Sequence, residues 1–318
     1  MRFGHRDPVP EALRGAVIAL GNFDGFHLGH QRVVAEAVEW ARAERRPAIV
    51  ATFDPHPVRH FAPHVPPFRL TTLDQREELF AAAGADAMLV FDFDDDLAAM
   101  SAQDFVGLLL AGHLGAAGVV TGEDFTFGKG RGGDVAVLAE EGARHGIAAR
   151  AVGPVSANGP GGTQAVSSSR IRDALKAGDC ETAARLMTRP FAIRGVVQHG
   201  DKRGRAIGYP TANLDLGAYL RPRYGVYAVS GRIIPGSGSG AGYGEVLKGA
   251  ANLGIRPQFN PPQELLEPYF FDFEGDLYGR EIEVALQHFL RPEAKFANLD
   301  ELKEQMAEDC RRARELLA

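Results

Sequence analysis

The sequence predicts two domains of different class: an α/β domain built on a parallel sheet, followed by an antiparallel β-barrel with a C-terminal helix. Apolar runs of strand length alternate with helical patterns through the first half of the 318 residues. From residue 191 onward, strand-like segments bounded by glycine follow one another without helical patterns between them. We therefore expect two hydrophobic cores, and we place the domains at residues 1–185 and 186–318.

Composition and charge limit the kinds of partner. A chain with 45% hydrophobic and 24% charged residues and a formal net charge of −6 is typical of a soluble globular protein. No run of Lys or Arg is long enough to follow a nucleic-acid backbone, so a nucleic-acid partner is disfavoured. The first twenty residues are too polar for a signal peptide or a membrane span, so we expect a cytoplasmic protein with no membrane partner. Cys180 and Cys310 lie in no C-x-x-C pair and are expected to be reduced.

The first half contains the elements of a parallel sheet. Strand candidates occupy residues 16–20, 48–53, 87–91, 118–121 and 147–152. The clearest helix candidate is 31–45, with Val34, Val38 and Ala41 on one face. Such alternation favours a sheet covered by helices on both faces, with ligands bound beyond the carboxyl ends of its strands.

Residues 21–30, G-N-F-D-G-F-H-L-G-H, are the clearest candidate for a binding site. A glycine-rich turn between a strand and a helix directs backbone N–H groups toward an anion, most often a phosphate. His27 and His30 lie on the same side of the first helical turn and can donate to phosphate oxygens. For a single histidine, a helix cap or an exposed side chain is the commoner explanation. The coincidence of both histidines with Asp24 and two turn glycines favours the phosphate site.

Two further motifs follow later strands. Residues 54–57, D-P-H-P, form a turn fixed by two prolines that presents a carboxylate and an imidazole. Residues 122–134 include five glycines, which can bring Lys129 and Arg131 near phosphates. A proline turn of purely structural importance and a flexible surface loop are the respective alternatives.

Residues 166–172, V-S-S-S-R-I-R, open a helix with hydroxyls at capping positions and two arginines in the first turn. Arginine at a helix N-terminus opposes the macrodipole, and this arrangement makes sense when an anion is held there. The alternative is a capped surface helix.

The second half contains the elements of the barrel. Its strand candidates are 191–198, 225–234, 247–253, 265–273 and 282–290. A last helix over 299–317, capped by Asn298 and Glu301, is expected to pack on the barrel.

A second candidate site lies in residues 199–214, a basic glycine-rich loop followed by G-Y-P-T-A-N. The hydroxyl of Thr211 and the amide oxygen of Asn213 can complete a Mg²⁺ shell that keeps several waters. Glu267 lies on an apolar strand, where a carboxylate is costly to bury. The Walker pattern is absent, so this is a different kind of phosphate loop.

These motifs resemble those of a known family. The G-x-F-D-G-x-H-x-G-H string resembles the nucleotidyltransferase signature, and residues 122–128 match G-x-D/N-F-x-F-G. Residues 166–172 resemble I-S-S-T-x-x-R, and residues 208–213 reproduce G-x-P-T-A-N, the hallmark of riboflavin kinases. Together they resemble the bacterial bifunctional riboflavin kinase/FMN adenylyltransferase (FAD synthetase) family. The resemblance implies a Rossmann-like α/β nucleotidyltransferase domain followed by a riboflavin kinase barrel.

The resemblance also implies roles for individual residues. In the adenylyltransferase, His27 and His30 are catalytic, and Asp124 lies on the flavin side, to which we add Asp54 and His56. ATP is contacted there by Gly21, Phe23, Asp24, His27, His30, Ser168, Ser169 and Arg172. In the kinase, Glu267 is the general base and Thr211 and Asn213 bind Mg²⁺. ATP is contacted there by Gly204, Gly208, Pro210, Thr211 and Asn213. Gln258 and Tyr269 depart from the family pattern, in which threonine and histidine are usual.

The expected chemistry is the formation of FMN from riboflavin and ATP, and then of FAD from FMN and ATP, with Mg²⁺ as cofactor. Small molecules are the expected partners, and weak self-association is left open. A different adenylyltransferase, acting on pantetheine phosphate or nicotinate mononucleotide, would leave the G-x-P-T-A-N motif unexplained. A flavin- or nucleotide-binding regulator with one inactive site is disfavoured by nearly intact motifs in both halves.

Overall fold

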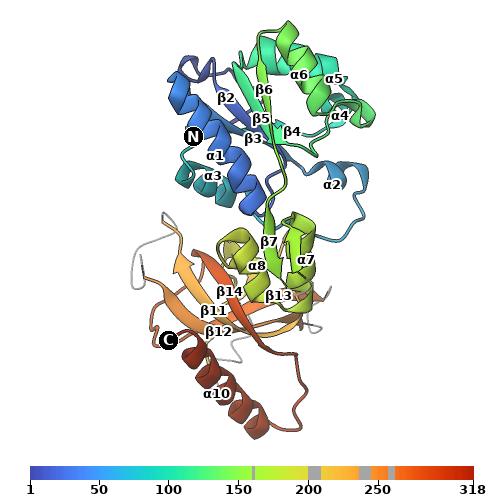
Figure 1. Cartoon of the computed structure of the whole chain (residues 1–318). Helices are drawn as coiled ribbons and strands as arrows, with labels where there is room; N and C mark the ends of the chain where they lie inside the picture. The colour runs from blue at the N-terminus through green and yellow to red at the C-terminus, as the bar shows by residue number, and fades with distance from the viewer. Residues whose placement is uncertain (160–161, 200–208, 236–244, 257–261) are drawn as a thin grey trace. The chain divides into compact units, whose positions relative to one another are not determined.

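The chain forms two compact units in the computed structural model, which describes residues 1–159, 162–199, 209–235, 245–256 and 262–318 (Figure 1). Unit 1 comprises Met1–Pro66 and Thr71–Ser167, and unit 2 comprises Pro67–Leu70 and Ser168–Ala318. The contacts thus assign residues 168–185 to the unit that contains the barrel. The domain boundary at residue 185 stays a prediction.

Unit 1 is built on a six-stranded parallel sheet with the order β1-β4-β3-β2-β5-β6. Its strands are β1 (Arg2–Gly4), β2 (Val17–Leu20), β3 (Ala48–Asp54), β4 (Ala87–Asp92), β5 (Gly118–Gly122) and β6 (Ala148–Val152). The predicted parallel α/β fold is confirmed. Strand β1 was not predicted, because three residues with one buried side chain give no periodic signal.

Two apolar cores lie on opposite faces of this sheet, since successive strand residues point to opposite sides. Ile18, Ile49 and Leu89 pack on one side, and Val17, Val50 and Met88 pack on the other. The helices and short helical turns of this unit are η1 (Glu11–Leu13), α1 (Leu28–Glu44), α2 (Pro57–Phe61), α3 (Leu73–Ala82), α4 (Asp95–Ala99), α5 (Ala102–Asp104), η2 (Phe105–His113), η3 (Lys129–Arg131) and α6 (Val135–Arg144). A hairpin of β7 (Ser156–Gly159) and β8 (Gly162–Ala165) completes the unit.

Unit 2 is an antiparallel sheet with the order β10-β13-β12-β11-β14-β9. Its strands are β9 (Phe191–Val196), β10 (Leu214–Asp215), β11 (Gly225–Ile233), β12 (Leu247–Arg256), β13 (Gln263–Phe270) and β14 (Glu281–Arg291). The two outermost strands approach each other, because the Gln198 N–H donates to the Asn213 carbonyl at 2.9 Å. This bridge nearly closes the sheet, and the predicted barrel is confirmed.

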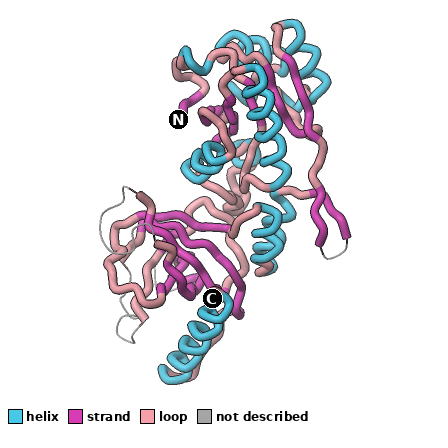
Figure 2. Tube along the Cα trace, turned by 60° about the vertical axis from the view of Figure 1, so that its left-hand side comes forward, coloured by secondary structure: helices cyan, strands magenta, loops and turns pink. Residues whose placement is uncertain are grey.

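Helices complete unit 2, in which strands dominate (Figure 2). Helices α7 (Ser168–Ala177) and α8 (Cys180–Met187) belong to this unit, and the Arg223 N–H donates to the Leu175 carbonyl at 3.0 Å. Helix α10 (Leu299–Leu316) packs Ala313 against the barrel residues Val226 and Phe271, as predicted. Among the described residues, no helix is long and apolar enough to cross a membrane.

Candidate active sites

The turn between β2 and α1 has an unusual backbone. Phe23 and Phe26 have φ angles of 48° and 41°, and Gly25 has a φ of 84°. A left-handed conformation at a residue other than glycine costs about 1–3 kcal/mol, so the surroundings must enforce it. Both phenylalanines are buried, with ring centroids 5.7 and 5.1 Å from that of Phe80 in α3. The packing therefore stabilises a strained turn directly before the two histidines.

His27 caps helix α1. Its Nδ1 accepts a hydrogen bond from the His30 backbone N–H at 3.3 Å, and the side chain is buried. Since Nδ1 accepts, the neutral imidazole carries its proton on Nε2, which can donate to a phosphate oxygen. The geometry is therefore compatible with both roles that the sequence suggests for His27, the helix cap and the phosphate donor.

The two imidazoles are stacked. The ring centroids of His27 and His30 lie 3.6 Å apart with an angle of 18° between the planes. Gly29 makes room for this stack, because a Cβ atom there would lie 3.2 Å from His27 Cε1. The motif thus combines two imidazoles and a helix N-terminus in one turn, the groups suited to a phosphate.

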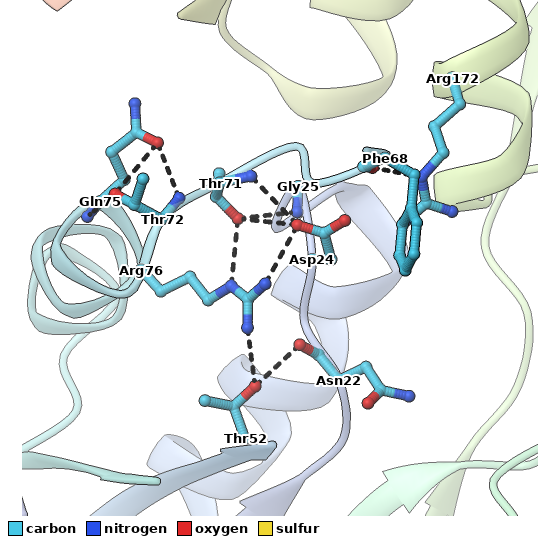
Figure 3. A network of polar contacts seen from close by, with 10 residues as sticks. All are labelled: Asn22, Asp24, Gly25, Thr52, Phe68, Thr71, Thr72, Gln75, Arg76 and Arg172. Atoms are coloured by element: carbon cyan, nitrogen blue, oxygen red, sulfur yellow. Dashed lines mark hydrogen bonds and ion pairs between the residues drawn. The ribbon is translucent and has the colours of Figure 1, made fainter. Parts of the chain in front are cut away.

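Asp24 lies in the interior of the turn, with 2% of its surface exposed. Its Oδ1 accepts from Arg76 Nη2 and from the Thr71 backbone N–H, both at 3.1 Å (Figure 3). Because these partners are protein groups, the contact of Asp24 with ATP stays a prediction. Sequence reasoning missed Arg76 and Thr71. The one available signal was the T-x-x-Q capping box at the start of α3, which locates a helix but gives no partner for Arg76.

The residues predicted for the flavin side all lie at or shortly after strand ends of unit 1. Asp54 ends β3, and the His56 Nδ1 accepts from the Val58 N–H at 3.2 Å as the cap of α2. Asp124 is exposed directly after β5. Sequence reasoning missed an aromatic cluster beside α2, in which the Phe93 ring lies 5.4 Å from His60 and 5.7 Å from the exposed Phe61.

The predicted phosphate residues of the V-S-S-S-R-I-R stretch begin helix α7 in unit 2, with Ser168 partly buried and Ser169 exposed. Arg172 Nε donates to the Phe68 carbonyl at 2.9 Å, and its guanidinium lies 5.0 Å from the Phe68 ring centroid (Figure 3). His27 and His30 belong to unit 1, so joint action of the two groups on one ATP stays a proposal.

Two of the residues predicted for the kinase lie on paired segments at one edge of the sheet. Leu214 pairs with Leu266, and the Ala212 N–H donates to the Pro268 carbonyl at 3.0 Å. This register puts Asn213 opposite Glu267. Opposite residues of antiparallel strands share a face, so Asn213 lies on the same face as Glu267. Thr211 precedes Asn213 by two positions and lies before the paired residues of β10, so its place beside Glu267 stays a prediction.

Glu267 has charged and polar neighbours on this face. Arg256 forms an ion pair with Glu267, and Asn252 of β12 lies opposite Glu267 in the register. Burial lowers the pKa of Arg256 from its usual value, although Glu293, 3.5 Å away, partly offsets this. A substrate hydroxyl that reaches Glu267 must therefore share or displace the guanidinium.

The other kinase predictions fall partly outside the described residues. Gly204, Gly208 and the departure at Gln258 lie there, whereas Pro210 is exposed. Within the described ranges, no group of three or more His, Cys, Asp or Glu side chains is arranged to hold a metal ion. Thr211 and Asn213 supply neutral oxygens beside a carboxylate, which fits Mg²⁺ that keeps waters and binds substrate phosphates.

Comparisons with known proteins agree with the division of the chain into two units. The family model for FAD synthetase matches residues 9–170, and that for riboflavin kinase matches residues 187–317. The bifunctional riboflavin kinase/FMN adenylyltransferase of Escherichia coli K12 is 40% identical over 301 residues, covering 95% of this chain and 92% of that protein. The Bacillus subtilis enzyme of the same name is 35% identical over 306 residues, covering 95% and 92%. A crystal structure described as a macrolide-efflux protein from Streptococcus pneumoniae is similar with a TM-score of 0.82, 30% identity and 97% of both chains covered.

Proposed function

The chain belongs to the bifunctional riboflavin kinase/FMN adenylyltransferase family, and from that premise we propose which of its residues perform each step. The enzyme phosphorylates riboflavin with ATP, giving FMN and ADP, and transfers AMP from ATP to FMN, giving FAD and pyrophosphate. Our residue assignment for the kinase is supported by the strand register, in which Asn213 lies opposite Glu267 and Thr211 stands two positions before Asn213.

In the kinase step, we assign proton removal to Glu267. Its carboxylate takes the proton from the riboflavin 5′-hydroxyl while that oxygen attacks the γ-phosphorus of ATP, and the bond to the β-phosphate oxygen breaks. Thr211 and Asn213 would hold Mg²⁺, which when bound would supply positive charge near the ATP phosphates. The glycines at 204 and 208 and Pro210 are proposed to contact the same ATP.

In the adenylyltransferase step, the FMN phosphate is itself the nucleophile. One of its oxygens attacks the α-phosphorus of ATP, the bond to the bridging oxygen breaks, and pyrophosphate leaves without a covalent enzyme intermediate. His27 and His30 donate to the phosphates, and the N-terminus of α1 adds backbone donors. Catalysis here is positioning and stabilisation of charge.

The remaining ligand contacts of this step are assigned by position. Gly21 and Phe23 border the turn before His27, and Ser168, Ser169 and Arg172 are proposed to bind the ATP phosphates. Asp54, His56 and Asp124 are proposed for the flavin side, where the aromatic cluster beside α2 offers an apolar surface to a planar ring. A cytoplasmic location is proposed because both steps consume ATP.

One assay with two variants tests these assignments. The protein is supplied with riboflavin, ATP and Mg²⁺, and the flavins are separated by chromatography. Glu267→Gln should slow FMN formation by about 10²- to 10⁴-fold and leave FAD formation from added FMN intact. His30→Ala should lower FAD formation by about 10²-fold or more and spare FMN formation. Equal damage to both activities in either variant would contradict two independent sites.

A further inference from the structure

A fully buried arginine lies beneath the phosphate-binding turn of unit 1. Arg76, in helix α3, is 1% exposed, and its ion-pair partner Asp24 is 2% exposed. Each nitrogen of the guanidinium makes a hydrogen bond: Nη2 to Asp24 Oδ1 at 3.1 Å, Nε to Thr71 Oγ1 at 3.2 Å and Nη1 to Thr52 Oγ1 at 3.2 Å (Figure 3). A lysine could not reach all three acceptors in this arrangement, because its three donors radiate from a single nitrogen, whereas arginine spreads its donors over the three nitrogens of a planar group.

The two threonines extend the contacts of Arg76 to the turn backbone. Thr52 Oγ1 donates to the Asn22 carbonyl at 2.8 Å, and Thr71 Oγ1 accepts from the Gly25 N–H at 3.0 Å. Thr71 Oγ1 also donates to Asp24 Oδ1 at 3.4 Å, so its one donor and two acceptor positions are all used. Through these bonds Arg76 reaches the turn at positions 22, 24 and 25.

Stability alone is a poor explanation for this pair. Apolar side chains of similar volume stabilise an interior as well as a buried ion pair does, or better. The hydrogen bonds of Arg76 and the two threonines instead lead to the backbone of the turn before α1. In that turn, Phe23, Gly25 and Phe26 have left-handed backbone conformations. The residue that follows Phe26 is His27, the cap of α1. The orientation of the turn therefore decides where the helix N-terminus and the imidazoles point.

The position of Arg76 is itself fixed by its helix. The Thr72 Oγ1 accepts from the Gln75 N–H at 3.2 Å, and Gln75 Oε1 accepts from the Thr72 N–H at 2.9 Å. This reciprocal cap sets the first turn of α3, so Arg76 is presented to Thr71 and Asp24 in one register.

We propose that Arg76 is a positioning residue for adenylyl transfer. It acts through Asp24, Thr71 and Thr52, and holds the turn so that His27 and the start of α1 are aligned with the α-phosphate of a nucleoside triphosphate. This inference rests on the proposed role of the H-x-G-H turn. It predicts a loss in kcat for FAD formation with little change in the KM for ATP, because alignment in the transition state is lost while the binding groups remain.

Two conservative variants and a matched control test the proposal. Arg76→Lys keeps the charge but loses the three-way bonding, and Thr52→Val removes one hydroxyl. Thr121→Val is the control: Thr121 is also 0% exposed near the carboxyl end of a strand adjacent to β2, and its hydroxyl has no hydrogen-bond partner among the described residues. Initial rates are measured for FAD formation from FMN and ATP, and for FMN formation by the same preparation.

We expect Arg76→Lys and Thr52→Val to lower kcat for FAD formation by about tenfold or more, the scale of a sub-ångström misalignment. In these two variants, the KM for ATP should stay within about threefold of the wild-type value, and the rate of FMN formation should be unchanged. The control Thr121→Val should match wild type in both reactions. Wild-type kcat in both test variants would overturn the proposal. An equal fall in both activities would also overturn it, since it would indicate general destabilisation.

A double variant covers the case in which the single variants fold poorly. Asp24→Leu combined with Arg76→Met replaces the pair with apolar side chains and leaves no unpaired buried charge. We expect a folded protein with normal kinase activity and at least a tenfold loss of FAD formation. FAD formation at the wild-type rate would overturn the proposal. If wild-type protein forms no FAD from FMN and ATP, the proposed adenylylation itself fails, and the inference with it.

Discussion

Replacing His27 with asparagine separates the two roles that the structure allows for this residue. His27 Nδ1 caps helix α1 by accepting from the His30 N–H at 3.3 Å, and Nε2 is the proposed donor to phosphate. Asparagine is among the preferred N-cap residues, and its Oδ1 can replace the Nδ1 acceptor. It has no group at the position of Nε2. His27→Asn therefore preserves the cap and removes the donor, whereas His27→Ala removes both.

Loss of the helix cap and loss of the phosphate donor should have effects of different size on stability and on rate. Loss of an N-cap costs about 1 kcal/mol of stability, so His27→Ala should lower the free energy of unfolding by that amount and His27→Asn should change it by less than about 0.5 kcal/mol. Loss of one donor to the transition state costs about 2.7–4 kcal/mol, or about 10²- to 10³-fold in rate. Both variants should therefore lose FAD formation to a similar degree, although only His27→Ala loses stability.

The assay combines urea denaturation with initial rates of FAD formation from FMN and ATP. Riboflavin phosphorylation by the same preparation is the internal control, because its proposed residues all lie in unit 2. FAD formation near the wild-type rate in His27→Asn, together with a deficit in His27→Ala, would show that His27 acts only as a cap. That result would refute the proposed phosphate contact of this residue.

Three further outcomes follow from other contacts. Gly29→Ala should lower FAD formation about threefold to tenfold, because the new Cβ would lie 3.2 Å from His27 Cε1 and displace the imidazole. Initial rates of FAD formation check this, with riboflavin phosphorylation by the same preparation as the control. Burial lowers the pKa of His5, whose Nδ1 accepts from the Asp92 N–H at 3.1 Å. The unfolded chain therefore binds a proton below about pH 6.5 that the folded protein does not, so the free energy of unfolding should fall as the pH drops through that value. His5→Asn keeps a hydrogen-bond acceptor but does not titrate. In this variant, the difference between the urea midpoints measured at about pH 5.5 and 7.5 should be smaller than in wild type. Thr211→Val should raise the Mg²⁺ concentration for half-maximal FMN formation about tenfold, which corresponds to a loss of about 1.4 kcal/mol of Mg²⁺ binding. A Mg²⁺ titration of the FMN-forming rate checks this. The same titration of FAD formation from FMN should be unchanged.

The fold class could be predicted because its signals are local and repeated. Strands of β-branched and other apolar residues, buried on both faces, indicated the parallel sheet, and glycine-bounded strands without helices indicated the barrel. Element boundaries that depend on a single side-chain contact were harder to predict. Helix α1 begins at Leu28, before the predicted residue 31, because the His27 side chain caps it.

The positioning residue of the turn could not be predicted from the same signals. Arg76 stands in the pattern D-Q-R-E-E, which is typical of a solvated helix face, yet its side chain is buried. Its partners Asp24 and Thr52 are 52 and 24 positions away. Motifs reveal which groups can touch a substrate, but a buried charge is recognised only when its distant partner is located.

The antiparallel register of β10 and β13 brings residues from separate motifs together where we propose the kinase site. Thr211 and Asn213 come from a loop motif and Glu267 from a strand, and sequence resemblance alone assigned them to one reaction. In the structure, Leu214 opposite Leu266 and Ala212 bonded to Pro268 fix which side chains share a face. Since side chains alternate along a strand, a slip of one residue would turn Asn213 away from Glu267. The proposed kinase site therefore depends on this register, and the buried Ala212 supplies the backbone bond that holds it.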